Sequence, residues 1–243
     1  MRVLKFGGTS VANAQNIKLV LDIVIKKAEH EKLIVVVSAF TKVTDLLVLA
    51  SQKASSNDES YKEIVAELEK KHLDAIKELI PVGEQSGLLS HIKRIINHLE
   101  TLLDGCFLLG ELSPRTSDTI LSFGELLSSY IIAEAFKQKN KNSGYKDSRE
   151  LIKTNNNFGK AAVNFEITNE LIADYFTSID SQIVVMPGFI ASTEEGIGTT
   201  LGRGGSDYTA AILAGALNAS ELEIWTDVNG MFTANPKIVK QAQ

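Results

Sequence analysis

Apolar positions near the N-terminus predict a parallel β-α-β unit. Residues 2–6 (RVLKF) read as a short strand, and the glycine turn GGTS follows it. Apolar residues then recur at helical spacing from Ile17 to Ala28. The run LIVVV at 33–37 is typical of a strand that is covered on both faces. A strand, a helix and a second strand in this order predict a parallel sheet with a right-handed crossover.

The middle third of the chain predicts helices. One apolar stripe lies in residues 60–80 and ends at Pro81, and another runs through residues 88–102. A third helix is predicted over residues 117–139, with Gly124 in its interior. An interior glycine costs about 1 kcal/mol relative to alanine. Gly124 therefore indicates either close packing or a local need for backbone freedom.

Strands and helices alternate again after the polar stretch at residues 139–150. The pattern predicts a buried strand within 181–189, a glycine-rich loop at 190–207, a helix at 206–219 and a strand at 221–227. The polar stretch is too short and too mixed in composition to mark a domain boundary. The whole pattern favours one α/β domain with a helical insertion.

Composition excludes several classes of protein. The chain has 243 residues, of which 44% are hydrophobic and 23% charged, which is ordinary for a globular protein. Its one cysteine, Cys106, excludes an intrachain disulfide, and its apolar surroundings predict a buried thiol. The net charge of -5 argues against a nucleic-acid backbone as the main partner. A small anionic ligand needs only local positive charge.

Metal and membrane sites are not expected. His30, His72, His91 and His98 lack the spacing of a zinc site. His91 and His98 could share a helix face, and we expect surface positions for them rather than a metal site. No apolar stretch approaches the ~18 residues of a membrane span. Met1 leads directly into a strand pattern rather than a signal peptide. We therefore expect a cytoplasmic protein without a membrane segment.

The first candidate for chemistry is KFGGTS at residues 5–10, between a strand and a helix. Two glycines allow close backbone approach, and a helix N-terminus presents free N–H groups to an anion. Lys5 could add a point charge for a phosphate. The spacing differs from a Walker A loop, because the lysine precedes the glycines. The alternative is an ordinary strand-to-helix turn.

The second candidate is LGRGGSDYTAA at residues 201–211. Three glycines, Gly202, Gly204 and Gly205, approach a helix for which we predict Ser206 or Asp207 as the N-cap. Arg203 among these glycines suits bidentate capture of a carboxylate or phosphate. The alternative is a capped helix after a flexible loop.

These segments are expected to meet in one site. Residues 5–10, 38–44 and 203–207 all follow predicted strands. Loops at the carboxyl ends of parallel strands converge on one side of the sheet, where ligands bind. Two adjacent anion-binding segments predict a phosphate donor that faces an acidic acceptor.

Two further motifs are more ambiguous. In SFGE at residues 122–125, Glu125 is either a surface residue or the partner of an ammonium group. In residues 223–237 a strand ends near Thr226, and Asn229-Gly230 predicts a hairpin turn.

In this order the motifs resemble those of aspartokinases, in the amino acid kinase family. The matching segments are KFGGTSV, SFGE, PGFIA with GTTLGRGGSDYTAA, and IWTDVNGMFTANPK. The opening MRVLKFGGTSVANA and the run LLGELSPRT are most similar to the kinase portion of bifunctional aspartokinase/homoserine dehydrogenases. The resemblance implies a carbamate kinase-like fold, a three-layer αβα sandwich around a mostly parallel sheet, with residues 1–243 as the catalytic domain.

The resemblance also implies a reaction. ATP and L-aspartate would give ADP and 4-phospho-L-aspartate, the first step toward lysine, threonine and methionine, with Mg²⁺ carried by the nucleotide and a homo-oligomeric parent protein. An acceptor carboxylate with a reference pKa near 3.9 needs no general base. Hence the reaction requires no histidine that acts as a general base.

Roles follow from matching positions. Lys5 and Asp207 would be catalytic, with Asp207 organising the lysine. Phosphates would lie against the amides and hydroxyls of Gly7, Gly8, Thr9, Ser10, Gly204 and Gly205. The substrate would be held by Ser38, Thr44, Glu125, Phe189, Arg203 and Ser206, with Arg203 on its α-carboxylate and Glu125 on its α-ammonium. The nucleotide would lie along Thr226, Asp227, Phe232 and Lys237.

The sequence departs from the family pattern in two ways. Phe232 and Asn235 stand where a tyrosine and an aspartate are usual. Regulatory ACT domains and a dehydrogenase domain are absent, so we expect a kinase portion truncated at its C-terminus, with an incomplete ATP site. Two alternatives remain: a kinase for another amino acid, carbamate or a nucleoside monophosphate, or a fragment that binds nucleotide or amino acid without turnover.

Overall fold

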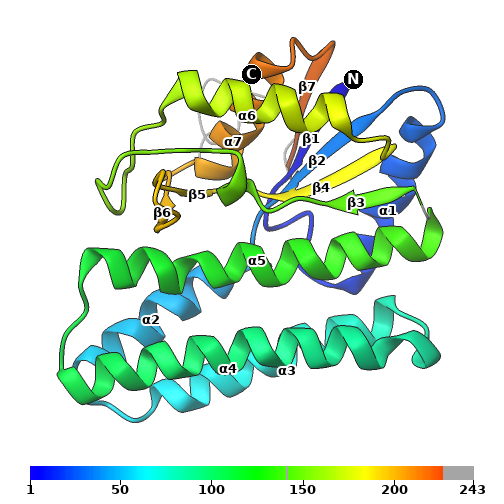
Figure 1. The fold of residues 1–243 in the computed structure, drawn as a ribbon. Helices are drawn as coiled ribbons and strands as arrows, with labels where there is room; N and C mark the ends of the chain where they lie inside the picture. Colours follow the sequence, from blue (N-terminus) through cyan, green and yellow to red (C-terminus); the bar gives the residue numbers. More distant parts are fainter. Residues whose placement is uncertain (141, 227–243) are drawn as a thin grey trace, which may run out of the picture.

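The structure, a computed structural model, describes residues 1–140 and 142–226. Its centre is a parallel sheet of five strands in the order β3-β4-β2-β1-β7 (Figure 1). The strands are β1 (Arg2–Phe6), β2 (Leu33–Val37), β3 (Ser143–Tyr145), β4 (Ile183–Pro187) and β7 (Glu221–Trp225). β1 pairs in parallel with both β2 and β7. The predicted β-α-β unit and the mostly parallel sheet are confirmed.

The two faces of the sheet carry separate apolar cores. Along β1, Leu4 and Phe6 pack into one core and Val3 packs into the other, because successive side chains of a strand point to opposite faces. Helices α1 (Ala14–Ala28) and α5 (Pro114–Lys139) cover the first face, and α6 (Phe165–Ser178) and α7 (Gly205–Ala216) cover the second. This arrangement is the predicted αβα sandwich.

The helical insertion adds a layer beyond α5. Helices α2 (Val43–Ser55), α3 (Tyr61–Leu79) and α4 (Gln85–Leu109) pack on one another and against α5 (Figure 1). The apolar pattern of the sequence predicted α3, α4 and α5, whereas α2 was not predicted. Helix α5 also begins three residues before its predicted start, because the side chain of Ser113 accepts a hydrogen bond of 3.1 Å from the amide of Thr116.

The glycine-rich segment at 190–207 contains more structure than predicted. β5 (Ile190–Ser192) and β6 (Gly198–Thr200) form an antiparallel hairpin there, outside the parallel sheet. Helix α7 then begins after Gly204, whose φ of +76° lies in the left-handed region that favours glycine. The predicted caps Ser206 and Asp207 are therefore wrong. Both residues lie in the first turn of α7 instead.

Helix α5 is a core element of this fold. By length and composition it could cross a membrane, but 72% of its most apolar 18-residue stretch is buried inside the structure. Core helices of globular domains pass the same test. The free thiol of Cys106, on the neighbouring helix α4, is buried as predicted.

One histidine is part of the apolar interior. His72 on α3 is fully buried, and its ring stacks on Phe40 with 5.0 Å between ring centroids. Helix α3 packs there against the loop after β2, which covers the imidazole. Loss of hydration lowers the pKa of His72 to about 4, which keeps the ring neutral.

Candidate active site

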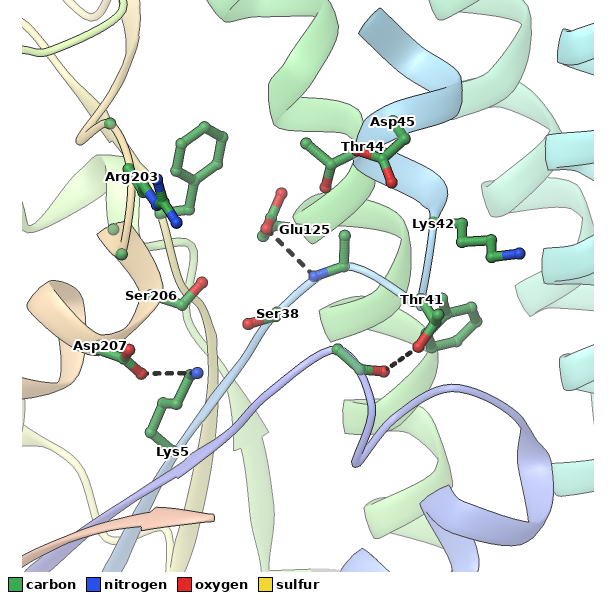
Figure 2. A pocket seen from close by; sticks show the side chains of 17 residues that line it. Lys5, Ser38, Thr41, Lys42, Thr44, Asp45, Glu125, Arg203, Ser206 and Asp207 are labelled. Carbon is green, nitrogen blue, oxygen red and sulfur yellow. Dashed lines mark hydrogen bonds and ion pairs between the residues drawn. The ribbon is translucent and has the colours of Figure 1, made fainter. Parts of the chain in front are cut away.

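A pocket of about 410 Å³ lies at the carboxyl ends of β1 and β2, between α5 and the N-terminus of α7 (Figure 2). It brings together residues from all three predicted loops. Of the predicted site residues, it is lined by Lys5, Gly8, Ser38, Thr44, Glu125, Phe189, Arg203, Gly204, Gly205, Ser206 and Asp207. The third loop follows β6 of the hairpin rather than a strand of the parallel sheet.

Lys5 is a largely buried cation in the pocket wall. It lies in β1, its side chain is only 12% exposed, and its Nζ atom is 2.7 Å from Oδ1 of Asp207. Asp207 belongs to the first turn of α7, which packs against β1. The sheet and the helix thus hold the ammonium group toward the pocket (Figure 2).

Glu125 is a buried carboxylate with one unused oxygen. The residue is 4% exposed, and its Oε1 accepts a hydrogen bond of 3.2 Å from the amide of Ala39. Among the described residues, Oε2 has no hydrogen-bond partner. Burial raises the pKa of Glu125 to about 8, and the Ala39 amide offsets part of that rise. Such a group gains stability from a ligand that brings a positive charge.

Gly124 explains how Glu125 reaches this position. A Cβ atom on Gly124 would lie 3.0 Å from Cβ of Ala39 and 3.3 Å from a methyl carbon of Leu47. Without that atom, α5 approaches the loop after β2 and the start of α2 closely. Close packing is therefore the reason for the interior glycine, and the surface interpretation of Glu125 is wrong.

Arg203 faces the pocket from the opposite side. Its side chain is exposed, and it makes no ion pair with any residue in 1–140 or 142–226. Figure 2 shows its guanidinium group across the pocket from Glu125. This places a guanidinium group with no ion-pair partner among the described residues opposite a buried carboxyl group, an arrangement that suits a ligand with both an ammonium and a carboxylate group.

Phe189 closes the wall next to Arg203 in a strained conformation. Its φ is +65°, which is rare for a residue with a side chain. The strained backbone is held by two hydrogen bonds: the Phe189 amide donates to Oγ1 of Thr209 at 3.0 Å, and its carbonyl accepts from the amide of Leu201 at 2.9 Å. A Cβ atom on Gly205 would lie 2.8 Å from the Phe189 ring, so only glycine fits there.

Within the KFGGTS segment, only Lys5 and Gly8 line the pocket. The amide of Gly7 donates to the carbonyl of Trp225 at 3.3 Å, and the hydroxyl of Ser10 donates to the same oxygen at 3.5 Å. Gly7, Thr9 and Ser10 do not line the pocket. The Gly7 amide is thus engaged by β7 and is not presented to a ligand, contrary to the prediction.

Six residues of the pocket wall were not among the predicted site residues: Ala39, Phe40, Thr41, Lys42, Asp45 and Gly202. Most of them follow β2 in the same loop as Ser38, so the strand-end rule already pointed to them, whereas Asp45 lies in the first turn of α2. Thr41 donates from its hydroxyl to the carbonyl of Gly8 at 2.7 Å and so joins two loops of the pocket. Nothing in the sequence indicated that particular contact.

The predicted nucleotide residues are mostly outside the described part. Thr226 is described and follows β7, which lies next to β1 in the sheet. Asp227, Phe232, Lys237 and the predicted Asn229-Gly230 turn lie outside the described residues. Within residues 1–140 and 142–226, no group of three or more His, Cys, Asp or Glu side chains could hold a metal ion.

Comparisons with known proteins agree with this geometry. The model of the amino acid kinase family matches residues 1–243. The chain is 35% identical to lysine-sensitive aspartokinase 3 of Escherichia coli and 35% identical to a chloroplastic bifunctional aspartokinase/homoserine dehydrogenase 2 of Zea mays, over 99% of this chain in both cases. The match covers 52% of the first relative and 26% of the second, so the chain spans between a quarter and a half of their lengths.

The fold is also similar to a solved structure. Escherichia coli aspartokinase III in complex with aspartate and ADP superimposes with a TM-score of 0.91 at 33% identity. The match covers all of this chain and 53% of that one. The pocket therefore occurs in a fold that is similar to a ligand-bound aspartokinase.

Proposed function

The chain belongs to the amino acid kinase family, and on that basis we propose that it transfers the γ-phosphoryl group of ATP to the side-chain carboxylate of L-aspartate. The product would be 4-phospho-L-aspartate. The observation that carries this proposal is the Oε2 atom of buried Glu125, which has no hydrogen-bond partner among the described residues and shares a pocket with the guanidinium group of Arg203. The similarity to aspartokinases over 99% of the chain supports the same reaction.

Glu125 and Arg203 would recognise the invariant part of an α-amino acid. The α-ammonium group would bind Oε2 of Glu125, and the α-carboxylate would bind Arg203 as a bidentate pair. Ser38, Thr44 and Ser206 would place hydroxyl groups around the substrate, and Phe189 would close the pocket over it. The side-chain carboxylate would then extend toward Lys5.

Lys5 would stabilise the transferring phosphoryl group. Its Nζ atom is held 2.7 Å from Asp207, which fixes the position of the cation before the substrates arrive. Gly8, Gly204 and Gly205 would let the backbone approach the phosphates, next to the positive end of α7. The acceptor is already ionised near neutral pH, so alignment and charge neutralisation account for catalysis without a general base.

The nucleotide would extend from Lys5 toward the end of β7. Thr226 follows that strand, and Asp227, Phe232 and Lys237 come next in the chain. The described residues form no metal-binding cluster, so a magnesium ion would be held by the nucleotide's own oxygens and by water. When bound, it would neutralise part of the phosphate charge.

A trapping assay tests the proposal. The protein is incubated with MgATP, L-aspartate and hydroxylamine, which converts an acyl phosphate to a coloured hydroxamate. We expect ADP and aspartyl hydroxamate in equal amounts, and much less product with N-acetyl-L-aspartate, which lacks the ammonium group. ADP formation that does not depend on aspartate, without hydroxamate, would contradict the proposal.

A further inference from the structure

Asp118 is a buried carboxylate of α5 that neither the sequence analysis nor the proposed reaction uses. It is 1% exposed. Its Oδ1 accepts hydrogen bonds from the amide of Gly159 at 3.0 Å and from the hydroxyl of Thr200 at 2.8 Å. Its Oδ2 accepts from the same Gly159 amide and from the amide of Thr200, both at 2.9 Å. Both oxygens therefore act only as acceptors.

These contacts fix the segment that carries Arg203. Thr200 is the last residue of β6, and its carbonyl also accepts a hydrogen bond of 3.0 Å from the amide of Ala161. Gly202 follows with a φ of +74°, so close to the Gly159 carbonyl that a Cβ atom would lie 3.3 Å from it. Asp118 thus holds both Gly159 and Thr200, and Thr200 lies three residues before Arg203.

Asp118 and Glu125 lie on the same helix, seven residues apart. Seven residues make about two turns of an α-helix, so both side chains leave α5 on one face. Arg203 lines the substrate pocket with Glu125, and it also lines an adjoining cavity of about 350 Å³ with Asp118. One rigid helix therefore carries both the partner of the ligand ammonium and the anchor of the arginine loop.

We propose that Asp118 is a positioning residue that sets the position of Arg203 relative to Glu125, and that it thereby selects ligands with an α-ammonium and an α-carboxylate group. This inference rests on the proposed function, because it assigns those two side chains to the two ends of an amino acid. Asp118 touches neither substrate. It acts through Thr200 and Gly159 on the loop that bears the guanidinium group.

The negative charge of the carboxylate strengthens this anchor. An asparagine of the same shape would keep one oxygen that accepts from the Gly159 and Thr200 amides, and its NH₂ group could donate to the Thr200 hydroxyl, but the side chain would lose the charge that strengthens these hydrogen bonds. The loop at residues 200–203 would then be held to α5 less tightly. Helix α5 itself would remain, since the sheet and α4 hold it through a large apolar core.

The test compares Asp118→Asn with Ser117→Ala in the whole protein. Ser117 neighbours Asp118 on α5 and lines the same cavity, but its side chain makes no hydrogen bond to a described residue. We expect D118N to raise KM for L-aspartate about tenfold or more, because small misplacements of a positioning group have effects of this size. KM for ATP should change by less than about twofold, and S117A should resemble the wild type.

Hydrogen exchange without ligand provides a second readout. In D118N, the amides of residues 159 and 200–205 should exchange faster, while those of β1 and β2 should not change. Thr200→Val, which removes only the hydroxyl contact, should shift the same amides and KM in the same direction by a smaller factor. T200V keeps the test decisive if D118N fails to fold.

The outcomes separate this inference from the proposed function. An unchanged KM for L-aspartate in D118N, or an equal rise in both KM values, would overturn the inference while the kinase reaction stands. A wild-type protein that makes no acyl phosphate would overturn the proposed function, and with it the selection of amino acids by Asp118. Faster exchange at residues 200–205 would still identify Asp118 as the anchor of that loop.

Discussion

Lys5 and Asp207 form an ion pair of 2.7 Å that joins strand β1 to the first turn of α7. The Lys5 side chain is largely buried, whereas half of the Asp207 side chain is exposed. A partly exposed pair of this kind contributes little to folding stability. Its value lies in holding one cation at a fixed place in the pocket.

Replacing Asp207 should therefore separate activity from stability. We expect Asp207→Asn to lower kcat about a hundredfold, as for loss of a preorganised electrostatic contact. The free energy of unfolding should change by no more than about 1 kcal/mol. Steady-state kinetics and urea denaturation measure the two effects. Asp174→Asn, at an exposed position of α6, serves as the control. A large loss of stability with normal kcat would contradict the assignment.

Removing the charge of Glu125 should affect the amino-acid substrate selectively. A hydrogen bond to a charged group contributes about 1.5–3 kcal/mol, so Glu125→Gln should raise KM for L-aspartate about 10- to 100-fold. KM for ATP should remain near its wild-type value. Measuring both constants for wild type and E125Q decides the point. Equal losses for both substrates would count against an ammonium partner.

The same residue should make stability depend on pH. Burial raises the pKa of Glu125 from 4.5 to about 8, so the ligand-free folded protein holds a proton that the unfolded chain releases. The stability that protonated Glu125 contributes to the folded state is fully present below pH 4.5 and is lost as the pH rises through about 8. E125Q should therefore become more stable relative to wild type across that range. Denaturation at both ends of the range measures the difference, and a parallel pH dependence for both proteins would refute the prediction.

Arg203 should be replaceable for folding but not for binding. Its side chain is exposed, so Arg203→Lys should leave the unfolding midpoint unchanged. Lysine keeps the charge but loses the planar fork, so KM for L-aspartate should rise about tenfold, which equals about 1.4 kcal/mol. Arg115→Lys, an exposed position on α5, is the matched control. Identical kinetics for R203K and R115K would exclude a bidentate contact.

Gly188 should tolerate no side chain. A Cβ atom there would lie 2.5 Å from Cβ of Ser206 and 2.8 Å from its Cα, so the first turn of α7 would have to move. We expect Gly188→Ala to destabilise the protein by about 1–3 kcal/mol and to lower kcat, since the same turn carries Asp207. Gly198→Ala meets no atom within 4 Å and should be nearly neutral. Calorimetric unfolding of both variants tests the contrast.

The sequence predicted the sheet because its strands are local patterns. The run at 33–37 is apolar at every position, and parallel topology then places the loops after β1 and β2 side by side. Helix α2 escaped prediction although its buried residues follow helical spacing, because three of them are the small residues Ala50, Ser51 and Ala54 and because the helix starts after Lys42, with a φ of +67° and no side-chain cap. β5 and β6 have three residues each, too few to show a period.

Contacts between distant segments could not be predicted. The burial of Glu125 depends on Gly124 packing against Ala39, which lies 86 residues from Glu125 in the chain. The Gly7 amide donates to Trp225 instead of facing the pocket because β7 pairs with β1. Asp118 could have been suspected, because a carboxylate stood among the apolar positions of a predicted helix.

Proton release on binding tests the central claim, that Glu125 receives the ammonium group of an amino acid. With a pKa of about 8, Glu125 is mostly protonated near pH 7 in the free protein, and an ammonium partner would ionise it. Titration calorimetry of L-aspartate in buffers of different ionisation enthalpy should therefore give release of about one proton near pH 7 in wild type and none in E125Q. Equal proton release in the two proteins, or tight aspartate binding by E125Q, would contradict the account.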